Sequence, residues 1–346
     1  NTEEYEMRSE ERQGESRETF EVGHFRPEDA AGIVRLFREV YGDDYPIKIF
    51  YDDQELTEAN AEGRYHSIVA RNPEGEVIGV QHLYQSAPYD RLYEVGAGVV
   101  LREFRNLGIG KRSLEYLYEE WIPRRDDIDE CFGEAVCNHP YMQRISAVAR
   151  FIDMAIEIAL MPAQAYVKEA SASGRVAAVL CFRCYRRRPQ AVYVPSVYED
   201  ELRYLYARLD DKRELKTARA GAFDECESEV ETAVFDFAQV ARIAVRRAGR
   251  DFASRIEAVE SEARSQNAIV IQVWLPANST AIDPAVDALR ERGYFFGGPL
   301  PRWFDHDGLL MQKLHCPPDF DAIQLHSDDA KRLLEWIERD YRWTRY

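Results

Sequence analysis

The spacing of apolar residues in the first half of the chain predicts alternating strands and helices. Short runs of alternating or unbroken apolar residues indicate strands, and apolar positions three or four residues apart indicate helices. Strands are expected at 20–25, 65–71, 77–84, 92–100, 130–136, 155–160 and 176–185, and helices at 30–41, 113–122 and 141–151. This order predicts an α/β (α+β) domain.

The second half repeats the later part of that order. Its pattern predicts helices at 199–209, at 252–263 and from Asp283-Pro284 to Gly293, and strands at 240–245, 268–275, 294–297 and 309–314. We expect a second domain similar to the first, and the alternative is an unrelated α/β or α+β domain. An amphipathic helix at 327–342 is expected to dock on one of the domains.

These patterns divide the chain into four parts. The segment 1–19 holds seven Glu and three Arg with hardly any apolar side chain, which predicts a flexible acidic tail. We expect domains at 20–190 and 191–317, and a C-terminal segment at 318–346 that carries the last helix.

Composition narrows the partners and the compartment. The 346 residues carry a net charge of −17 at pH 7, which disfavours nucleic acid and anionic membrane surfaces and suits an amine-bearing substrate. There is no run of 18 apolar residues and no basic-then-apolar leader, so neither a membrane span nor a signal peptide is expected. Of the six cysteines, Cys181 and Cys184 would point to opposite faces of a strand. We therefore expect a reduced, cytoplasmic protein without a metal site.

One junction between a strand and a helix has the composition of an anion site. The strand at 92–100 leads into Arg105-Asn106-Leu107-Gly108-Ile109-Gly110-Lys111, and a helix follows. Glycine lets a ligand approach the backbone closely, and unpaired N–H groups at a helix start attract anions. The junction therefore predicts a phosphate cradle, and an ordinary connection with glycines for tight packing is the alternative.

Arg105 to Gly110 match the Arg/Gln-x-x-Gly-x-Gly/Ala motif of the GNAT superfamily, the general-control-related N-acetyltransferases. With the element order over about residues 20–190, the chain resembles this superfamily. The resemblance implies a GNAT-like mixed, mostly antiparallel sheet flanked by helices, and acetyl-CoA (coenzyme A) as co-substrate with no metal. The motif does not recur after residue 190, so a second GNAT-like domain would be degenerate and lack a coenzyme site.

The resemblance also implies which residues bind the coenzyme. The N–H groups of the motif would hold the pyrophosphate, Arg105 and Lys111 would supply charge, and the preceding strand edge would pair with the pantetheine arm. A parallel strand that splays away, here 130–136, would open the slot for the thioester. The implied coenzyme contacts are Val99, Val100, Leu101, Arg105, Asn106, Leu107, Gly108, Ile109, Gly110, Lys111 and Asn138.

Acetyl transfer to an amine needs a base for the amine proton and an acid for the leaving thiolate. The resemblance implies Glu94 as the base, and a carboxyl group among apolar strand residues would have a raised pKa that suits this role. A surface glutamate is the alternative, and Glu134 on the neighbouring strand is the reserve base, acting through water. Tyr141 is the candidate acid and His139 the other, because the family's customary tyrosine position falls near Ile145.

The sequence leaves two functions from different classes. The first is an acetyl-CoA-dependent N-acyltransferase in which an amine acceptor, a small cationic amine or a protein amine, attacks directly with general-base assistance. The second is a regulatory or scaffold protein that binds acyl-CoA without turnover. A third possibility is that the second domain creates the acceptor site, or a homodimer contact, at the mouth of the first domain.

Overall fold

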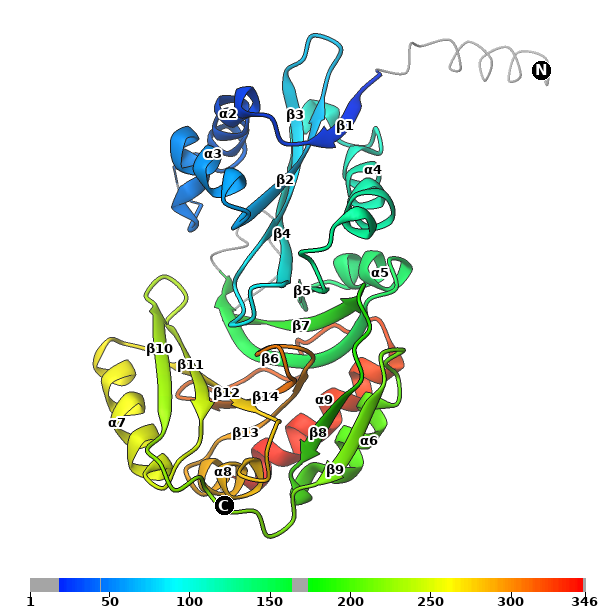
Figure 1. Ribbon diagram of the computed structural model, residues 1–346. Coiled ribbons are helices and arrows are strands. Elements are labelled where there is room, and N and C mark those ends of the chain that lie inside the picture. The colour runs from blue at the N-terminus through cyan, green and yellow to red at the C-terminus, as the bar shows by residue number, and fades with distance from the viewer. Residues whose placement is uncertain (1–18, 44, 164–173, 345–346) are drawn as a thin grey trace, which may run out of the picture. The chain divides into compact units, whose positions relative to one another are not determined.

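The computed structural model describes residues 19–43, 45–163 and 174–344, and these form two compact units (Figure 1). The N-terminal unit comprises the described residues within 1–84 and 96–124, and the C-terminal unit comprises those within 85–95 and 125–346. The acidic tail expected at 1–19 lies outside the described residues, apart from Thr19. The domain limits expected at 190 and 317 stay a prediction. The two compact units meet at other positions in the sequence.

The N-terminal unit is an antiparallel sheet with helices on both sides (Figure 1). Its strands, in hydrogen-bonded order, are β1 (Glu21–His24), β2 (Tyr65–Arg71), β3 (Val77–Tyr84) and the last part of β4 (Leu92–Val100). Its helices are α2 (Ala30–Tyr41), α3 (Asp53–Ala61) and α4 (Ile109–Glu115). A π-helical segment, Tyr116–Trp121, continues α4.

Apolar residues on the facing surfaces hold this unit together. Ile33 and Phe37 of α2 are fully buried, as their helical spacing predicts. The Phe37 ring stacks on Phe50 with 4.3 Å between ring centroids. The buried guanidinium of Arg71 forms an ion pair of 2.6 Å with Asp29, which compensates both charges inside the core.

The C-terminal unit contains three sheets. In the first, the order is the start of β4, β5 (Glu130–Val136), β7 (Arg175–Cys184) and β6 (Ile152–Pro162). The second has the order β10 (Glu229–Phe235), β11 (Val240–Arg247), β12 (Val270–Pro276), β14 (Gly308–Leu314) and β13 (Phe295–Leu300). The third pairs β8 (Gln190–Val194) with β9 (Arg213–Thr217). The helices are α5 (Tyr141–Val148), α6 (Glu199–Tyr206), α7 (Phe252–Ser265), α8 (Ile282–Glu291) and α9 (Asp328–Trp343).

Antiparallel pairing predominates in both large sheets. Parallel pairs are β4 with β5, β11 with β12, and β8 with β9. The predicted α/β (α+β) class, with mostly antiparallel sheets flanked by helices, is confirmed. Within 19–43, 45–163 and 174–344, no helix is long and apolar enough to cross a membrane.

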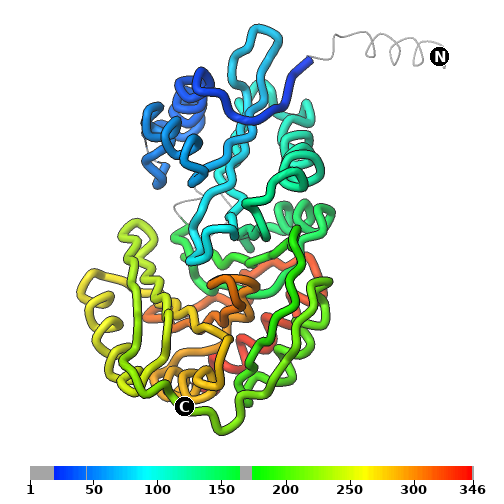
Figure 2. Tube along the Cα trace, viewed as in Figure 1, coloured from blue at the N-terminus to red at the C-terminus, as the bar shows by residue number. Residues whose placement is uncertain are grey.

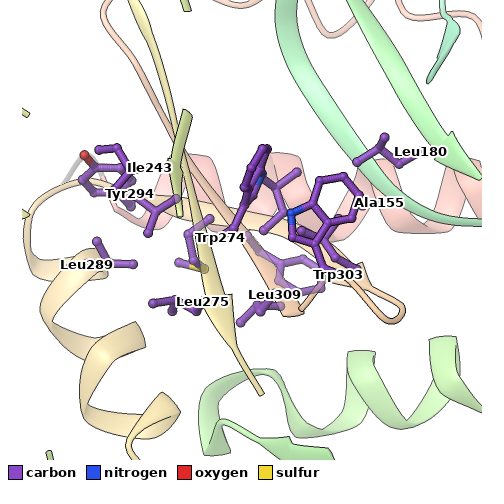
Figure 3. Packing of buried hydrophobic residues seen from close by; sticks show 14 of the residues in the cluster. Ala155, Leu180, Ile243, Trp274, Leu275, Leu289, Tyr294, Trp303 and Leu309 are labelled. Atoms are coloured by element: carbon purple, nitrogen blue, oxygen red, sulfur yellow. The ribbon is translucent and has the colours of Figure 1, made fainter. Parts of the chain in front are cut away.

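The two large sheets of the C-terminal unit share one core. β12 is buried along its whole length, as its unbroken apolar run predicts. The side chain of Gln312 on β14 links it to β6, because it accepts the Ile158 N–H at 2.8 Å and donates to the Ile156 carbonyl at 2.9 Å. β6 and β13 run side by side (Figure 2), and Trp274 packs against Trp303 at 5.0 Å between centroids (Figure 3). This core therefore contains residues from both sides of position 190.

Some element boundaries differ from the sequence expectations. The helix expected at 113–122 begins earlier, at Ile109, because Gly108 already acts as its N-cap. Strand β10 was not expected, since most of its side chains are exposed and it lacks apolar alternation. Helix α8 begins at Ile282 rather than after an Asp283 cap, and the Asp283 carboxylate accepts the Ser196 N–H instead.

Candidate functional site

The expected phosphate cradle is a turn between β4 and α4 in the N-terminal unit. Asn106 and Gly108 have positive φ angles of 71° and 84°. A Cβ atom added at Gly108 or at Gly110 would meet nothing within 4 Å. The left-handed backbone at Gly108 favours glycine, and the space beside both glycines is open to a ligand.

The backbone N–H groups of this turn are available to an anion. The first hydrogen bond of α4 runs from the Arg112 N–H to the Gly108 carbonyl at 2.9 Å. From Asn106 to Lys111, no N–H group donates to another group in the part of the chain that the structure describes. Unpaired N–H groups at a helix start, next to residues in left-handed conformation, form a concave donor surface for anions. The turn can therefore hold phosphate oxygens through its backbone.

Basic side chains of the motif lie at the turn with partners of their own. The Arg105 Nε donates to the Val100 carbonyl at 3.2 Å. The Lys111 ammonium lies 3.6 Å from the Glu115 carboxylate, and 81% of the Lys111 side chain is exposed. Such exposed interactions contribute little to the free energy of folding, so both side chains can leave these partners and bind a phosphate instead. Leu107 is 42% exposed beside them.

Buried residues hold the cradle in place. Val99, Leu101 and Ile109 are all nearly inaccessible to solvent, whereas Val100 is partly exposed. Gly79 of β3 lets α4 approach the sheet, since a Cβ there would lie 2.9 Å from the Ile109 Cγ2. The strand end and the helix start are therefore fixed against each other.

An irregularity in β4 precedes the cradle. Ala97 has a φ of 51° between Gly96 and Gly98. The Gln81 Nε2 donates to the Gly96 carbonyl at 2.8 Å, and a Cβ at Gly98 would meet the Gln81 Oε1 at 2.3 Å. A side chain thus replaces a backbone partner here, as at a bulge. The two glycines therefore accommodate the irregular strand geometry at Ala97.

The candidate base Glu94 lies on the first part of β4, in the C-terminal unit. It is 8% exposed, and the Ser86 Oγ donates to its Oε2 at 2.7 Å. The alternative that Glu94 is a surface residue is therefore wrong. β4 pairs with β5 only over residues 92–94, opposite 130–132. The slot for the thioester that the resemblance implied beside the strand at 130–136 stays a prediction.

The reserve base Glu134 belongs to a cluster that the sequence analysis missed. The Arg242 Nη2 donates to Glu134 at 2.7 Å and to Glu157 at 3.2 Å. The Arg242 Nε donates to the Gln272 Oε1 at 3.0 Å, and the Gln272 Nε2 donates to Glu157 at 2.8 Å. Glu134 is therefore held as an ion pair, and the elements that meet here are β5, β6, β11 and β12.

Burial changes the ionisation of this cluster. It raises the pKa of Glu157 to about 8, and the neighbouring Glu134 carboxylate adds to the rise while Arg242 opposes it. Burial alone would lower the pKa of Arg242, but the carboxylates of Glu134 and Glu157 raise it overall. Glu157 and Arg242 are the only charged residues in the apolar runs 155–160 and 240–245. That pattern was the sequence signal for the cluster.

The remaining candidates lie around the start of α5 in the C-terminal unit. Tyr141 is the first residue of α5 and is 65% exposed, whereas Asn138 is buried. The His139 Nδ1 accepts the Tyr141 N–H at 3.4 Å. The roles of Tyr141 as acid and of Asn138 as coenzyme contact stay predictions. Among the residues described, no group of three or more His, Cys, Asp or Glu is placed to hold a metal ion.

Comparison with known proteins gives one kind of match. No family model and no curated protein matches the chain. Solved structures that match include a GNAT-family acetyltransferase from Streptococcus pneumoniae, at 12% identity over 48% of this chain and 99% of that one with a TM-score of 0.39. Another is the ribosomal-protein-S18-alanine N-acetyltransferase from Escherichia coli, at 12% identity over 49% of this chain and 96% of that one with a TM-score of 0.39. A third is an aminoglycoside 6'-N-acetyltransferase complexed with coenzyme A, at 14% identity over 49% of this chain and 99% of that one with a TM-score of 0.35. At TM-scores below 0.5 this likeness has no bearing on activity or substrate. Over about half its length the chain is similar to solved GNAT acetyltransferases, the superfamily that its sequence resembles.

Proposed function

We propose that the chain is an acetyl-CoA-dependent N-acyltransferase that acts on an amine. The cradle carries this proposal, because its N–H groups from Asn106 to Lys111 have no acceptor within the described parts of the chain. A pyrophosphate offers several acceptor oxygens to such a donor surface. Open space at Gly108 and Gly110 leaves room for it.

The residues around the turn would hold the rest of the coenzyme. In this proposal Val99, Val100 and Leu101 form the edge for the pantetheine arm, and Leu107 and Ile109 complete the turn. Arg105 and Lys111 add positive charge. The Lys111 ammonium is exposed, so it can supply this charge without any change in the fold. When bound, acetyl-CoA supplies an activated acyl thioester.

Proton transfer needs a carboxyl group and a hydroxyl group. The amine nitrogen forms a C–N bond as the C–S bond breaks, and Glu94 accepts the amine proton. Burial of Glu94 beside Ser86 suits a positioned base, because a fixed carboxylate needs no reorganisation when the proton arrives. Glu134 stays the reserve base, and Tyr141 is the proposed proton donor to the leaving sulfur.

Thermal unfolding with acetyl-CoA tests the coenzyme site. We expect acetyl-CoA at about 100 times its Kd to stabilise the protein by about 2.7 kcal/mol, which raises the Tm by several degrees. Gly110→Glu places a negative charge on the donor surface and should abolish the shift, whereas Gly110→Ala should keep it because a Cβ meets nothing there. An unchanged Tm in the wild type with acetyl-CoA and longer acyl-CoAs contradicts the proposal.

A second function follows from the exposure of Tyr141. A side chain that is 65% exposed is poorly fixed as an acid for a leaving thiolate, which favours an acyl-CoA-binding protein without turnover. Thiol release from acetyl-CoA across a panel of amines separates the two functions. Release with any amine supports the transferase, and bound coenzyme that is never consumed supports the binding protein. A cytoplasmic location and a homodimer remain predictions.

A further inference from the structure

The cluster around Arg242 holds more acidic than basic groups. Glu134 and Glu157 both accept hydrogen bonds from Arg242, and the charge of Glu94 is close enough to raise the pKa of Glu157 further. Three carboxyl groups therefore share one guanidinium. Gln272 is neutral and adds only hydrogen bonds.

Two buried polar atoms of this cluster have no partner. The Glu157 side chain is 2% exposed, and its Oε2 makes no hydrogen bond within the described parts of the chain. The same holds for the Nε1 of Trp274, whose ring lies 5.6 Å from the Arg242 guanidinium. Buried polar atoms are nearly always paired, and leaving one unpaired costs about 1–3 kcal/mol. An additional donor at Glu157 would remove that cost.

Two side chains of this cluster are partly exposed to solvent. The side chains of Glu134 and Arg242 are 20% and 15% exposed. Phe235 of β10 is 47% exposed and places its ring 5.6 Å from the Arg242 guanidinium. An aromatic face next to carboxylates is a favourable surface for a positive charge.

We propose that this cluster binds the acceptor of the transfer reaction through a positively charged ammonium group. The ammonium would donate to the Glu157 Oε2 and to Glu134, against the ring of Phe235. Arg242 bridges the two carboxylates and Gln272 also holds that of Glu157, so both are positioned. The C-terminal half of the chain would thereby select a cationic acceptor, and this inference rests on the proposed transferase function.

The charge balance favours an ammonium over an anion. An anion would face the carboxylates of Glu94 and Glu134, whose repulsion Arg242 alone cannot offset, whereas an ammonium would displace the proton that Glu157 keeps at pH 7. An ammonium would add a second positive charge beside Arg242 and so balance the acidic groups. Its three N–H donors also suit carboxylate oxygens that accept without donating.

Calorimetric titration of the full chain at pH 7 with 1,4-diaminobutane tests the site, with 1,4-butanediol as the neutral control. We expect the diamine to bind and the diol not to bind. Glu157→Gln keeps the side-chain shape and should weaken diamine binding about tenfold or more. Glu130→Gln is the matched control, since Glu130 is also fully buried with a pKa raised by burial to about 8, but it faces Arg213 and Arg302. Its diamine affinity should stay within about twofold of the wild type.

Phe235→Ala keeps the test decisive if Glu157→Gln fails to fold. Phe235 is largely exposed, so its removal should weaken the diamine about threefold without loss of the folded state. Equal binding of diamine and diol, or unchanged diamine affinity in both Glu157→Gln and Phe235→Ala, overturns the inference.

The Tm shift with acetyl-CoA separates this inference from the proposed function. A shift that persists in a protein that binds no diamine overturns the inference and leaves the transferase proposal standing. Diamine binding without any acetyl-CoA shift overturns the transferase proposal and supports the cluster as a cation site.

Discussion

Two junctions in this chain combine a strand, a glycine turn and a helix, yet their backbones offer different groups to a ligand. One is the cradle between β4 and α4, and the other is the stretch Arg246–Asp251 between β11 and α7. Both follow a strand with a parallel neighbour, and both contain glycine and several cations. Residue composition alone would treat them alike.

In the second junction, other groups of the chain already accept hydrogen bonds from the N–H groups of the turn. The Gly249 N–H donates to the Ser228 Oγ and the Arg250 N–H to the Cys226 carbonyl, both at 3.0 Å. The Asp251 carboxylate accepts the Ser228 N–H at 2.6 Å. A Cβ at Gly249 would lie 2.1 Å from the Cys226 carbonyl oxygen.

The two junctions therefore differ in their available N–H groups, and not in glycine and arginine as such. A cavity of about 180 Å³ remains where β11 and β12 end. Arg246 and Arg247 line it together with Asp224 and Glu229, so its cations already face carboxylates. The segment 224–228 uses the donors that a phosphate would need.

The largest effect that would sharpen this contrast is on stability. Gly249→Ala should destabilise the protein by about 1–3 kcal/mol, because the new methyl group collides with backbone that has little room to move. Gly110→Ala should stabilise it by about 0.5–1 kcal/mol, since alanine favours the helix and meets no atom. Urea unfolding of both variants measures the two changes.

Equal destabilisation by the two alanines would break the comparison. It would mean that the turn after β4 is packed as closely as the turn after β11. Unfolding slopes that match the wild type would show that the two variants differ in stability and not in the surface exposed on unfolding.

The two units also differ in how their buried groups respond to pH. Burial lowers the pKa of His82 in the N-terminal unit to about 3, so the unfolded chain binds a proton there first and stability falls as pH drops below about 6.5. Burial raises the pKa of Glu157 to about 8, so the folded chain keeps a proton that the unfolded chain loses. Stability from Glu157 therefore falls as pH rises from about 4.5 to about 8.

Each proton contributes a slope of at most about 1.4 kcal/mol per pH unit. Glu157→Gln should flatten the decrease between pH 5 and 8, and Glu130 should account for the slope that remains. Urea unfolding at several pH values measures the slopes. Hydrogen exchange in β3 and in β6 assigns each slope to its unit. A slope unchanged by Glu157→Gln contradicts the assignment.

Local patterns made the cradle predictable from the sequence. Arg105 to Lys111 are consecutive, and the conformation of Gly108 follows from its place between a strand and a helix. The burial of β12 could likewise be predicted from one unbroken apolar run. Such features depend on neighbours along the chain.

The cluster around Arg242 could not be assembled in that way. Its members lie on four different strands: Glu134, Glu157, Arg242 and Gln272. The hydrogen bond between Gln272 and Glu157 joins residues that are 115 positions apart in the sequence. The lone charges of Glu157 and Arg242 in apolar runs indicate that each needs a partner, but no local rule says which. The partner of Gly249 could not be predicted either, because Ser228 comes from a neighbouring loop.

The smallest expected effect concerns the exposed cations of the two junctions. Lys111→Ala should weaken acetyl-CoA binding about threefold, because an exposed ammonium near a phosphate is largely screened by water and salt. Arg246→Ala in the second junction should leave the affinity unchanged. Calorimetry at 50 and 300 mM salt measures both, and the loss from Lys111→Ala should shrink at high salt. The Arg246 guanidinium already pairs with Glu231 and would have to leave that carboxylate to bind a phosphate. A weaker affinity in Arg246→Ala would therefore show that the second junction also binds the coenzyme.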